Sequence, residues 1–284
     1  MLMQDLQKKI KNSQIYILIR AAFRLSLFFL IIFSYFFCAI LKTITTLSST
    51  KRRWRLIKNG HFFSKVMLKA FQIEIICREK IPEYEVSLLV GNHVGFIDII
   101  CLLALCPSVF ITSLEMKKTS GLGLITDLAG CAYVDRKKRM NIQEELKDIT
   151  NVLKEGFRVV LYAESVASNG EQVLPFKKTL LMSAGFSGQP IRPFVFNFRQ
   201  INQRNIRYED RDAVCWYGEE TFISALWRSL KLESITCEIE FFPLVYPSSS
   251  IHRAELAQQL HQLISSRYSH FYPQMNRENS FKKG

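Results

Sequence analysis

His93 and Asp98 stand five residues apart in the run G-N-H-V-G-F-I-D-I-I, and this pair could carry proton-transfer chemistry. A carboxylate that fixes one imidazole nitrogen leaves the other free to accept a proton from a hydroxyl group. On one continuous helix the two side chains would diverge by about 140°. We therefore expect His93 in a turn before the helix, where Gly95 makes a bend easy. The alternative is a structural turn histidine followed by an acid at a helix start.

The chain around this pair shows no serine or cysteine in a recognisable nucleophile elbow. Direct attack by a hydroxyl group of a bound acceptor, without a covalent enzyme intermediate, is then the economical mechanism, with His93 as general base. Help of this kind is worth about 10² to 10⁴ in rate.

Short β-type runs and longer helical stretches alternate after about residue 72, which favours an α/β fold with a mixed sheet sandwiched by helices. Strands are expected at Ile73–Cys77, Ser87–Val90, Ser108–Thr112, Ala132–Val134, Arg158–Tyr162, Ile191–Val195 and Thr236–Phe242. Helices are expected at Ile97–Leu105, Gly123–Leu128, Asn141–Glu155, Lys178–Phe186 and Glu220–Leu230, with a last amphipathic helix after Ile251. His93 then lies where a strand gives way to a helix, a common place for site residues.

An uncharged run from Leu25 to Leu41 predicts a membrane-associated helix at the N-terminus. Its seventeen residues would span roughly 25 Å, at the short end of what crosses a bilayer. The run starts late for a secretory signal peptide and no small-residue cleavage site follows it. Spanning the bilayer and lying in one leaflet both remain open, and a buried core helix is the third alternative.

Basic residues flank the apolar run on both sides, so the positive-inside rule gives no orientation. They are Lys8, Lys9, Lys11, Arg20 and Arg24 before it, then Lys51, Arg52, Arg53, Arg55 and Lys58 after it. A helical hairpin with both ends on an anionic cytoplasmic face suits this pattern, with the segment around His61 to Phe71 as the returning arm.

The net charge of +13 calls for an anionic partner, and a membrane surface, phosphorylated metabolites and nucleic acid all qualify. Nucleic acid is disfavoured because the chain has no helix-turn-helix, zinc-finger or RNP-like pattern. The seven cysteines stand singly, without a C-x-x-C pair or a histidine at metal spacing. We expect buried free thiols in a reducing compartment and no metal site.

Four blocks of the sequence resemble, in order, the motifs of the glycerolipid and lysophospholipid acyltransferase family, whose best-known members acylate 1-acyl-glycerol-3-phosphate. The stretch N-H-V-G-F-I-D resembles its N-H-x4-D signature, and G-C-A-Y-V-D-R, residues 130–136, its second block. Y-A-E-S-V-A-S-N-G-E-Q-V-L-P-F-K, residues 162–177, is similar to the F-P-E-G-T block, and I-R-P-F-V-F, residues 191–196, to the fourth. A late stretch, residues 216–228, also resembles bacterial members.

The resemblance implies that His93 and Asp98 are catalytic and that further residues of the blocks bind substrate. These are Asn92, Arg136, Glu164, Ser165, Lys177 and Pro193. Arginine suits bidentate contact with a phosphate, and Glu164 could accept hydrogen bonds from the acceptor or pair with Arg136. Lys137, Lys138 and Arg139 either add positive potential beside the site or form a solvated charge run, and Lys177 is open to the same two interpretations.

Two departures from the family pattern bear on the acceptor head group. The usual Pro-Glu-Gly reads Ala163-Glu164-Ser165, and Ser165 costs on the order of 1 kcal/mol if its backbone adopts the positive φ of the family glycine. Ser113 stands where many members carry a lysine.

The resemblance and the residue pattern together predict three regions and one activity. Residues 1–71 form a membrane anchor, 72–250 the acyltransferase domain, and 251–284 a C-terminal helix and tail. The enzyme would take acyl-CoA or acyl carrier protein as co-substrate, need no cofactor, and act at the membrane, with its catalytic domain on the cytoplasmic face. The alternatives are another acceptor, such as a lyso-ornithine lipid, and a non-catalytic lipid-binding homologue.

Overall fold

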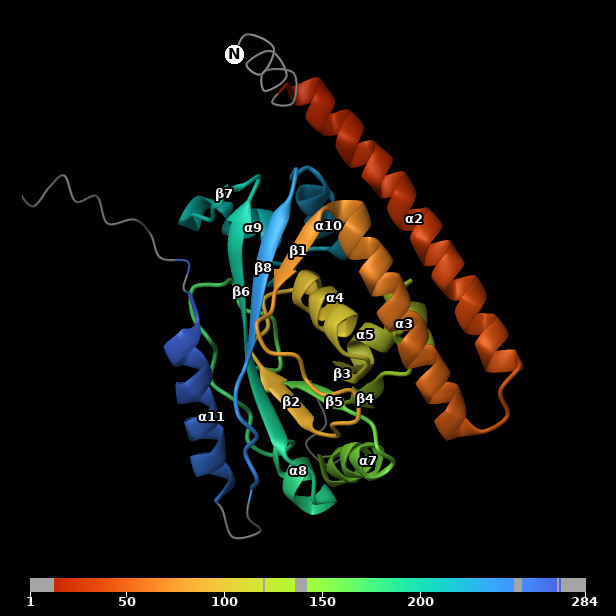
Figure 1. Ribbon diagram of the computed structural model, residues 1–284, viewed down its shortest axis with the longest axis vertical. Coiled ribbons are helices and arrows are strands. Elements are labelled where there is room, and N and C mark those ends of the chain that lie inside the picture. Colours follow the sequence, from red (N-terminus) through yellow and green to blue (C-terminus); the bar gives the residue numbers. More distant parts are fainter. Residues whose placement is uncertain (1–12, 120, 136–141, 248–251, 270, 272–284) are drawn as a thin grey trace, which may run out of the picture.

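The computed structural model describes residues 13–119, 121–135, 142–247, 252–269 and 271 (Figure 1). Its centre is an eight-stranded mixed sheet in the order β1-β8-β6-β2-β5-β3-β4, with β7 paired to β6. The strands are β1 Ile73–Ile76, β2 Leu88–Gly91, β3 Val109–Ser113, β4 Ala132–Val134, β5 Val159–Tyr162, β6 Ile191–Ile201, β7 Arg204–Asn205 and β8 Ile235–Phe241. All pairings are parallel except those of β6 with β8 and with β7.

Helices cover both faces of the sheet, which confirms the predicted α/β sandwich (Figure 1). They are α4 Phe96–Leu105, α5 Leu114–Lys118, α6 Leu122–Leu128, α7 Ile142–Lys154, α8 Met182–Ser187, α9 Arg211–Val214, α10 Phe222–Leu230 and α11 Arg253–Arg267, with a 3-10 turn at Tyr208–Asp210. The parallel strand β2 is buried on both faces, as expected for a strand between two helical layers.

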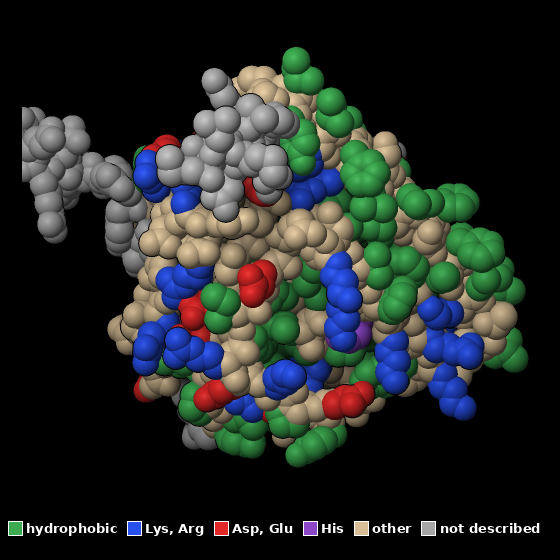
Figure 2. Space-filling view, turned by 45° about the horizontal axis from the view of Figure 1, so that its top comes forward, with side chains coloured by type: hydrophobic (Ala, Val, Ile, Leu, Met, Phe, Trp, Pro, Cys, Tyr) green, Lys and Arg blue, Asp and Glu red, His purple; other side chains and the backbone are tan. Residues whose placement is uncertain are grey.

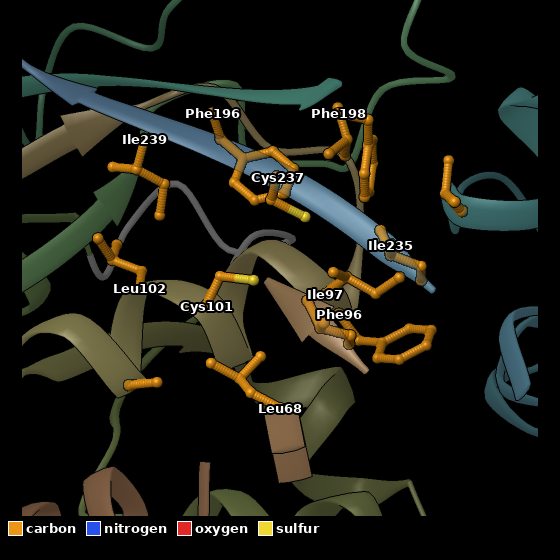
Figure 3. Packing of buried hydrophobic residues seen from close by; sticks show 14 of the residues in the cluster. Leu68, Phe96, Ile97, Cys101, Leu102, Phe196, Phe198, Ile235, Cys237 and Ile239 are labelled. Atoms are coloured by element: carbon orange, nitrogen blue, oxygen red, sulfur yellow. The ribbon is translucent and has the colours of Figure 1, made fainter. Parts of the chain in front are cut away.

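Side chains on successive positions of β2 enter two separate cores. Leu89 joins the core under α4 and the N-terminal helices, whereas Leu88 and Val90 join the core under α7, α8 and α11. Figure 3 shows the first core, where Cys101 and Leu102 of α4 face Cys237 and Ile239 of β8. The loop between β2 and α4 is held at each end, because the strand before it and the helix after it are both packed into these cores.

Two long helices, α2 Gln14–Ile44 and α3 Ser49–Phe71, pack side by side at one edge of the molecule (Figure 1). The returning arm expected near His61–Phe71 is therefore present, and it begins twelve residues earlier than His61, at Ser49. α2 is also longer than the uncharged run. It continues through Arg20 and Arg24 because both guanidinium groups donate to backbone carbonyls just after α10.

α2 is the one helix among the described residues that is long and apolar enough to cross a membrane. Only 22% of its most apolar window is buried, which rules out the core-helix alternative. Its buried side is a narrow stripe at helical spacing, formed by Ala21, Arg24, Phe28, Ile31, Tyr35 and Ala39. Large apolar side chains lie on its outer side, and Figure 2 shows them gathered along this edge with Lys and Arg side chains beside them. α2 is thus a membrane-associating helix.

The predicted strands all occur, with ends shifted by one residue or so, except that β6 runs on to Ile201. The helix expected from Lys178 begins only at Met182. The short elements α5, β7 and α9 were not expected. All seven cysteines are free thiols. The predicted domain boundaries stay a prediction, although the first core joins α2 and α3 to the sheet.

Candidate active site

The loop from Asn92 to Gly95 connects the end of β2 to the start of α4 and carries His93. α4 begins at Phe96, so His93 lies in the turn before the helix, as the five-residue spacing requires. Gly95 has φ +147°, and a Cβ added there would lie 2.8 Å from the backbone nitrogen of Trp216. Glycine is needed at this position for its backbone angle and for the close approach of the neighbouring segment.

His93 and Asp98 are in contact. Nδ1 of His93 lies 3.0 and 3.1 Å from the two carboxylate oxygens of Asp98. The carboxylate is fully buried, while the imidazole is 17% exposed. A carboxylate at this distance fixes the Nδ1–H tautomer, which leaves the lone pair of Nε2 to accept a proton. The geometry predicted for the pair is thus present.

Asp98 also shapes the loop itself. One of its oxygens accepts hydrogen bonds from the backbone N–H groups of Val94 and Gly95, at 2.7 and 3.0 Å. Asp98 lies in the first turn of α4, where the helix dipole favours a negative charge. One side chain therefore orients the imidazole, caps the helix and closes the turn.

Tyr162, at the end of β5, lies directly against His93. The two rings are stacked with centroids 4.1 Å apart and planes within 14°. Burial, with Asp98 nearby, raises the pKa of the Tyr162 phenol well above its usual range, so the phenol is neutral. The tyrosine gives the imidazole a flat support. This role was not predicted, although the aromatic residue that opens the third block was its signal in the sequence.

Glu164 is buried beneath the same loop, and both of its oxygens accept backbone hydrogen bonds. Oε1 accepts from the N–H of His93 at 2.7 Å, and Oε2 from the N–H of Leu174 at 2.8 Å. Burial raises the pKa of Glu164 to about 8, against the opposite effect of the two hydrogen bonds. Its observed partners are thus the backbone of the His93 loop and of the third block. The predicted contact with substrate stays a prediction.

Ser165, next to Glu164, has φ +68°. Ser165 therefore adopts the positive φ expected if it replaces the family glycine, and a residue with a Cβ occupies a conformation that glycine takes without strain. The following Val166 is 52% exposed, so this turn reaches the surface. Substrate contact by Ser165 stays a prediction.

Asn92 and Pro193 are buried and connect β2 to β6. The Asn92 amide donates to the carbonyl of Phe196 at 3.0 Å and accepts from its N–H at 2.8 Å. Pro193 pairs in register with Val90. These contacts fix the point where His93 leaves the sheet, and a substrate contact for either residue stays a prediction.

Of the predicted cationic contacts, Lys177 lies among the described residues and Arg136 does not. Lys177 is exposed at the end of the third block, where its backbone N–H donates to Ala163. Arg136 lies outside the described residues, as do Lys137, Lys138 and Arg139. Ser113 caps α5, with its hydroxyl accepting from the N–H of Met116.

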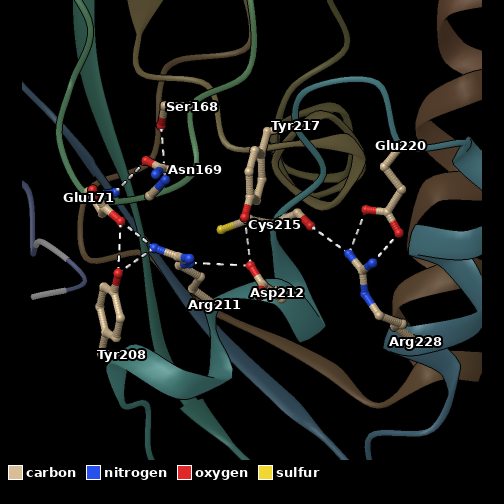
Figure 4. A network of polar contacts seen from close by, with 11 residues as sticks. Ser168, Asn169, Glu171, Tyr208, Arg211, Asp212, Cys215, Tyr217, Glu220 and Arg228 are labelled. Carbon is tan, nitrogen blue, oxygen red and sulfur yellow. Dashed lines mark hydrogen bonds and ion pairs between the residues drawn. The ribbon is translucent and has the colours of Figure 1, made fainter. Parts of the chain in front are cut away.

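A second segment, residues 208–220, packs onto the loop that carries His93. Its Trp216 N–H donates to the carbonyl of Val94 at 2.9 Å. From the third block, the N–H of Ser168 donates to the carbonyl of His93 at 2.8 Å. Figure 4 shows the polar network around this segment, in which Arg211 joins Glu171 to Asp212 and Arg228 pairs with Glu220. Residues 216–228 resemble a late stretch of many bacterial family members, but no role could be assigned to them from the sequence.

The fold defines a mixed α/β enzyme domain with a helical membrane anchor. Comparison with known proteins agrees with this class. Residues 72–197 match the family model described as Acyltransferase. The chain is 26% identical to a lyso-ornithine lipid O-acyltransferase of Brucella abortus over 221 residues, covering 73% of this chain and 83% of the relative.

Other relatives carry a different name. A 1-acyl-sn-glycerol-3-phosphate acyltransferase of Neisseria gonorrhoeae is 27% identical over 201 residues, covering 70% of this chain and 76% of the relative. The crystal structure of the 1-acyl-sn-glycerophosphate acyltransferase PlsC from Thermotoga maritima is similar in fold, with a TM-score of 0.64 and 16% identity, over 90% of this chain and 97% of that one.

The family resemblance read from the four sequence blocks is confirmed: residues 72–197 match the acyltransferase family model, and the similar proteins carry acyltransferase names.

Proposed function

We propose that the protein transfers a fatty acyl group from a thioester donor to the free hydroxyl of a 1-acyl-glycerol-3-phosphate type lysophospholipid. The observation that carries the proposal is the His93–Asp98 pair, with Nδ1 held by a buried carboxylate and the ring partly exposed. Residues 72–197 belong to the acyltransferase family, and relatives named for this acceptor cover most of the chain.

The chemistry needs one base and no covalent enzyme intermediate. Nε2 of His93 takes the proton of the acceptor hydroxyl as its oxygen attacks the thioester carbonyl carbon. The C–S bond then breaks, and the departing thiolate takes the proton back from the imidazolium. Asp98 stabilises the positive charge that His93 carries between the two steps. The products are an ester and a free thiol, and the enzyme returns to its starting protonation state.

Stabilisation of the oxyanion must come from groups other than the backbone N–H groups of Val94 and Gly95. The N–H groups of Val94 and Gly95 point at Asp98, which uses both. Arg136 and Lys177 remain the proposed cationic contacts for the phosphate of the acceptor, because arginine binds phosphate in bidentate geometry and lysine as a point charge. The proposed donors are acyl-CoA or acyl carrier protein, and the reaction as written needs no metal or cofactor.

The anchor is proposed to lie in one leaflet, because α2 is bonded to the domain at points from Arg20 to Tyr35. Arg20 and Arg24 bond to carbonyls after α10, and the hydroxyl of Tyr35 donates to the carbonyl of Ile125 in α6 at 3.2 Å. Near its end, Lys42 bonds to Asn59 of α3. A helix docked in this way could cross a bilayer only by drawing the domain in with it.

The outer sides of the two anchor helices suit a membrane surface of anionic lipid. Large apolar side chains cover the outer side of α2, and α3 carries seven cations and no acid between Ser49 and Phe71. A leaflet of anionic lipid would bury the apolar side chains and attract the cations. The cytoplasmic leaflet carries anionic lipid, so we propose that the catalytic domain lies on that face.

A lyso-ornithine lipid is the second candidate acceptor. Several relatives carry that name, including the one from Brucella abortus and one from Pseudomonas aeruginosa that is 26% identical over 223 residues. The altered third block favours it, since Ser165 replaces the usual glycine beside the site. This acceptor would be acylated by the same His93 chemistry.

The test is acyl transfer by purified full-length protein on anionic vesicles, with labelled acyl-CoA and acyl carrier protein as donors. The acceptors are 1-acyl-glycerol-3-phosphate, lyso-ornithine lipid and lysophosphatidylcholine. We expect preferred turnover of the first, and a loss of about 10² to 10⁴ in kcat for His93→Ala. The matched control is His261→Ala, which removes an imidazole that bonds to the carbonyl of Val173.

Each result has a separate meaning. Preference for lyso-ornithine lipid would transfer the assignment to the second candidate. Equal turnover of all acceptors would contradict both assignments. If the His93→Ala variant kept wild-type transfer, the base would be elsewhere, and if wild type transferred nothing from either donor, the chain would be a lipid-binding homologue without activity.

A further inference from the structure

Four aromatic side chains connect the membrane helix α2 to the catalytic loop. We call them the aromatic bridge: Phe28 of α2, Phe96 of α4, Trp216 of the following segment and Phe222 of α10. Phe28 lies 6.2 Å from Phe222, and Phe222 lies 5.3 Å from Phe96 and 5.5 Å from Trp216, measured between ring centroids. Phe96 and Trp216 are 6.4 Å apart. Phe222 is thus the ring that touches all three others.

Both ends of the aromatic bridge are firmly held. Phe28 is 6% exposed, and one turn earlier in α2 Arg24 bonds to carbonyls that follow α10. At the other end, Phe96 is the first residue of α4, directly after the turn that carries His93. The backbone of Trp216 bonds to Val94 and approaches Gly95 so closely that no Cβ would fit.

The indole ring of Trp216 is also held by hydrogen bonds within its own segment. Its indole N–H donates to the carbonyl of Glu220 at 2.8 Å, and Arg228 of α10 pairs with the carboxylate of Glu220 and bonds to the carbonyl of Cys215 (Figure 4). The segment from Cys215 to Arg228 is therefore held together by its own hydrogen bonds. A displacement of α2 or α10 reaches the catalytic loop through packed rings, because packed interiors transmit strain.

We infer that Trp216 and Phe222 are positioning residues, which fix the His93–Asp98 loop relative to α2 so that the seating of α2 in lipid sets the geometry of the loop. The inference rests on the proposed function. Neither ring needs to touch substrate. Removing Phe222 would leave the anchor able to bind lipid and the acceptor able to bind, while the imidazole would no longer be held in its productive place. The expected signature is a fall in kcat at nearly constant KM.

The test compares Phe222→Ala, Phe222→Leu and a matched control, Phe63→Ala. Phe63 is also a partly buried ring, but it packs against Tyr35 and Phe62 within the anchor. For each protein, three quantities are measured: co-sedimentation with anionic vesicles, kcat and KM with acceptor in vesicles, and kcat with a monomeric short-chain acceptor before and after addition of acceptor-free vesicles.

We expect acceptor-free vesicles to raise the kcat of wild type on the monomeric acceptor by about ten-fold. Phe222→Ala should bind vesicles like wild type, lose this stimulation and lose about ten-fold in kcat on vesicles, with KM within two-fold. Phe222→Leu, which fills most of the same space, should recover most of the loss. Phe63→Ala should keep kcat within two-fold.

Several outcomes would overturn the inference while leaving the proposed function intact. One is wild-type kcat and stimulation in Phe222→Ala. Another is a loss of kcat matched by an equal loss of vesicle binding, which would make Phe222 part of the anchor alone. A third is an equal loss in Phe63→Ala. An absence of transfer by wild type would instead remove the proposed function, and this inference with it. If Phe222→Ala did not fold, a low kcat in a folded Phe222→Leu that binds vesicles would support the inference, and a wild-type kcat would overturn it.

Discussion

Two buried carboxylates hold the same loop, and they do so in different ways. Asp98 comes from the first turn of α4, five residues after His93, and contacts the imidazole and two backbone N–H groups. Glu164 comes from the segment after β5, seventy-one residues along the chain, and contacts the backbone N–H groups of His93 and Leu174. Asp98 therefore acts on the ring, whereas Glu164 acts on the backbone that carries the ring.

The surroundings of the two carboxylates differ as much as their partners. Asp98 lies at a helix start and contacts the ring Nδ1 of His93 and two backbone N–H groups. Glu164 has two backbone N–H groups only, and burial raises its pKa to about 8. The loop is thus supported by one carboxylate placed to orient the base and by another whose charge is costly. Substitution of each should separate orientation of the base from support of the loop.

The largest effect is expected from Asp98→Asn. The two N–H groups of Val94 and Gly95 would keep the amide oxygen, so the amide NH2 would face the imidazole. Nδ1 would then have to accept and Nε2 would carry the proton, which is the wrong tautomer for a base. We expect a fall in kcat of about 10² to 10⁴ at unchanged vesicle binding, measured by acyl transfer on vesicles.

The control for Asp98→Asn is Asp127→Asn, because Asp127 is a half-exposed carboxylate of α6 that pairs with Lys117. It should leave kcat unchanged, since exposed pairs contribute little. A kcat for Asp98→Asn within a few-fold of wild type would show that the carboxylate does not select the tautomer, and the two carboxylates would then have the same supporting role.

A smaller effect, with its own pH dependence, is expected from Glu164→Gln. The pKa of Glu164 in the folded protein is about 8, above the ordinary value of 4.5 for a glutamate. Between these values the folded state holds a proton that the unfolded state has lost, so this group's contribution to stability decreases as pH rises from about 4.5 to about 8. Glutamine does not titrate. The variant should be less stable than wild type at pH 5, because its NH2 faces one of the two N–H donors, and the difference should shrink toward pH 8.

Denaturant unfolding in detergent micelles at pH 5, 6.5 and 8 checks this expectation. Other groups titrate alike in both proteins, so the difference between the two free energies of unfolding reports Glu164 alone. A difference that stayed constant or grew with pH would mean that the two backbone hydrogen bonds hold Glu164 as a carboxylate throughout. In activity, the looser His93 backbone should lower kcat only a few-fold.

The contrast between the carboxylates also shows what could be predicted from sequence. The His93–Asp98 contact is local, so the spacing and Gly95 showed how the two side chains could meet, and the resemblance of the four blocks favoured the contact. The returning arm of the anchor followed from an apolar run with basic flanks. The contacts of Glu164 with His93 and of Asn92 with Phe196 could not be predicted, because these residues meet only through the pairing of β2 with β5 and β6.

The same reason explains the other misses. α2 runs beyond the uncharged stretch because the segment just after α10, two hundred residues later, offers carbonyls to Arg20 and Arg24. Tyr162 and Trp216 have roles only once their segments lie beside the loop. The short helices α5 and α9 are too short to show a period, and tertiary contacts decide them.

The smallest expected effect concerns the turn that carries Glu164. Ser165 has φ +68°, where a Cβ costs about 1–2 kcal/mol, so Ser165→Gly should relieve this strain. Part of the gain is offset by about 0.5–1 kcal/mol, because glycine has more freedom in the unfolded chain. We expect a net stabilisation of up to about 1 kcal/mol by denaturant unfolding. Ser224→Gly, in the regular helix α10, should instead destabilise by a similar amount. If Ser165→Gly stabilises the protein but lowers kcat, the strained serine is retained for its contact with the acceptor; if kcat is unchanged, the hydroxyl has no part in the site and Ser165 is removed from the proposed substrate contacts.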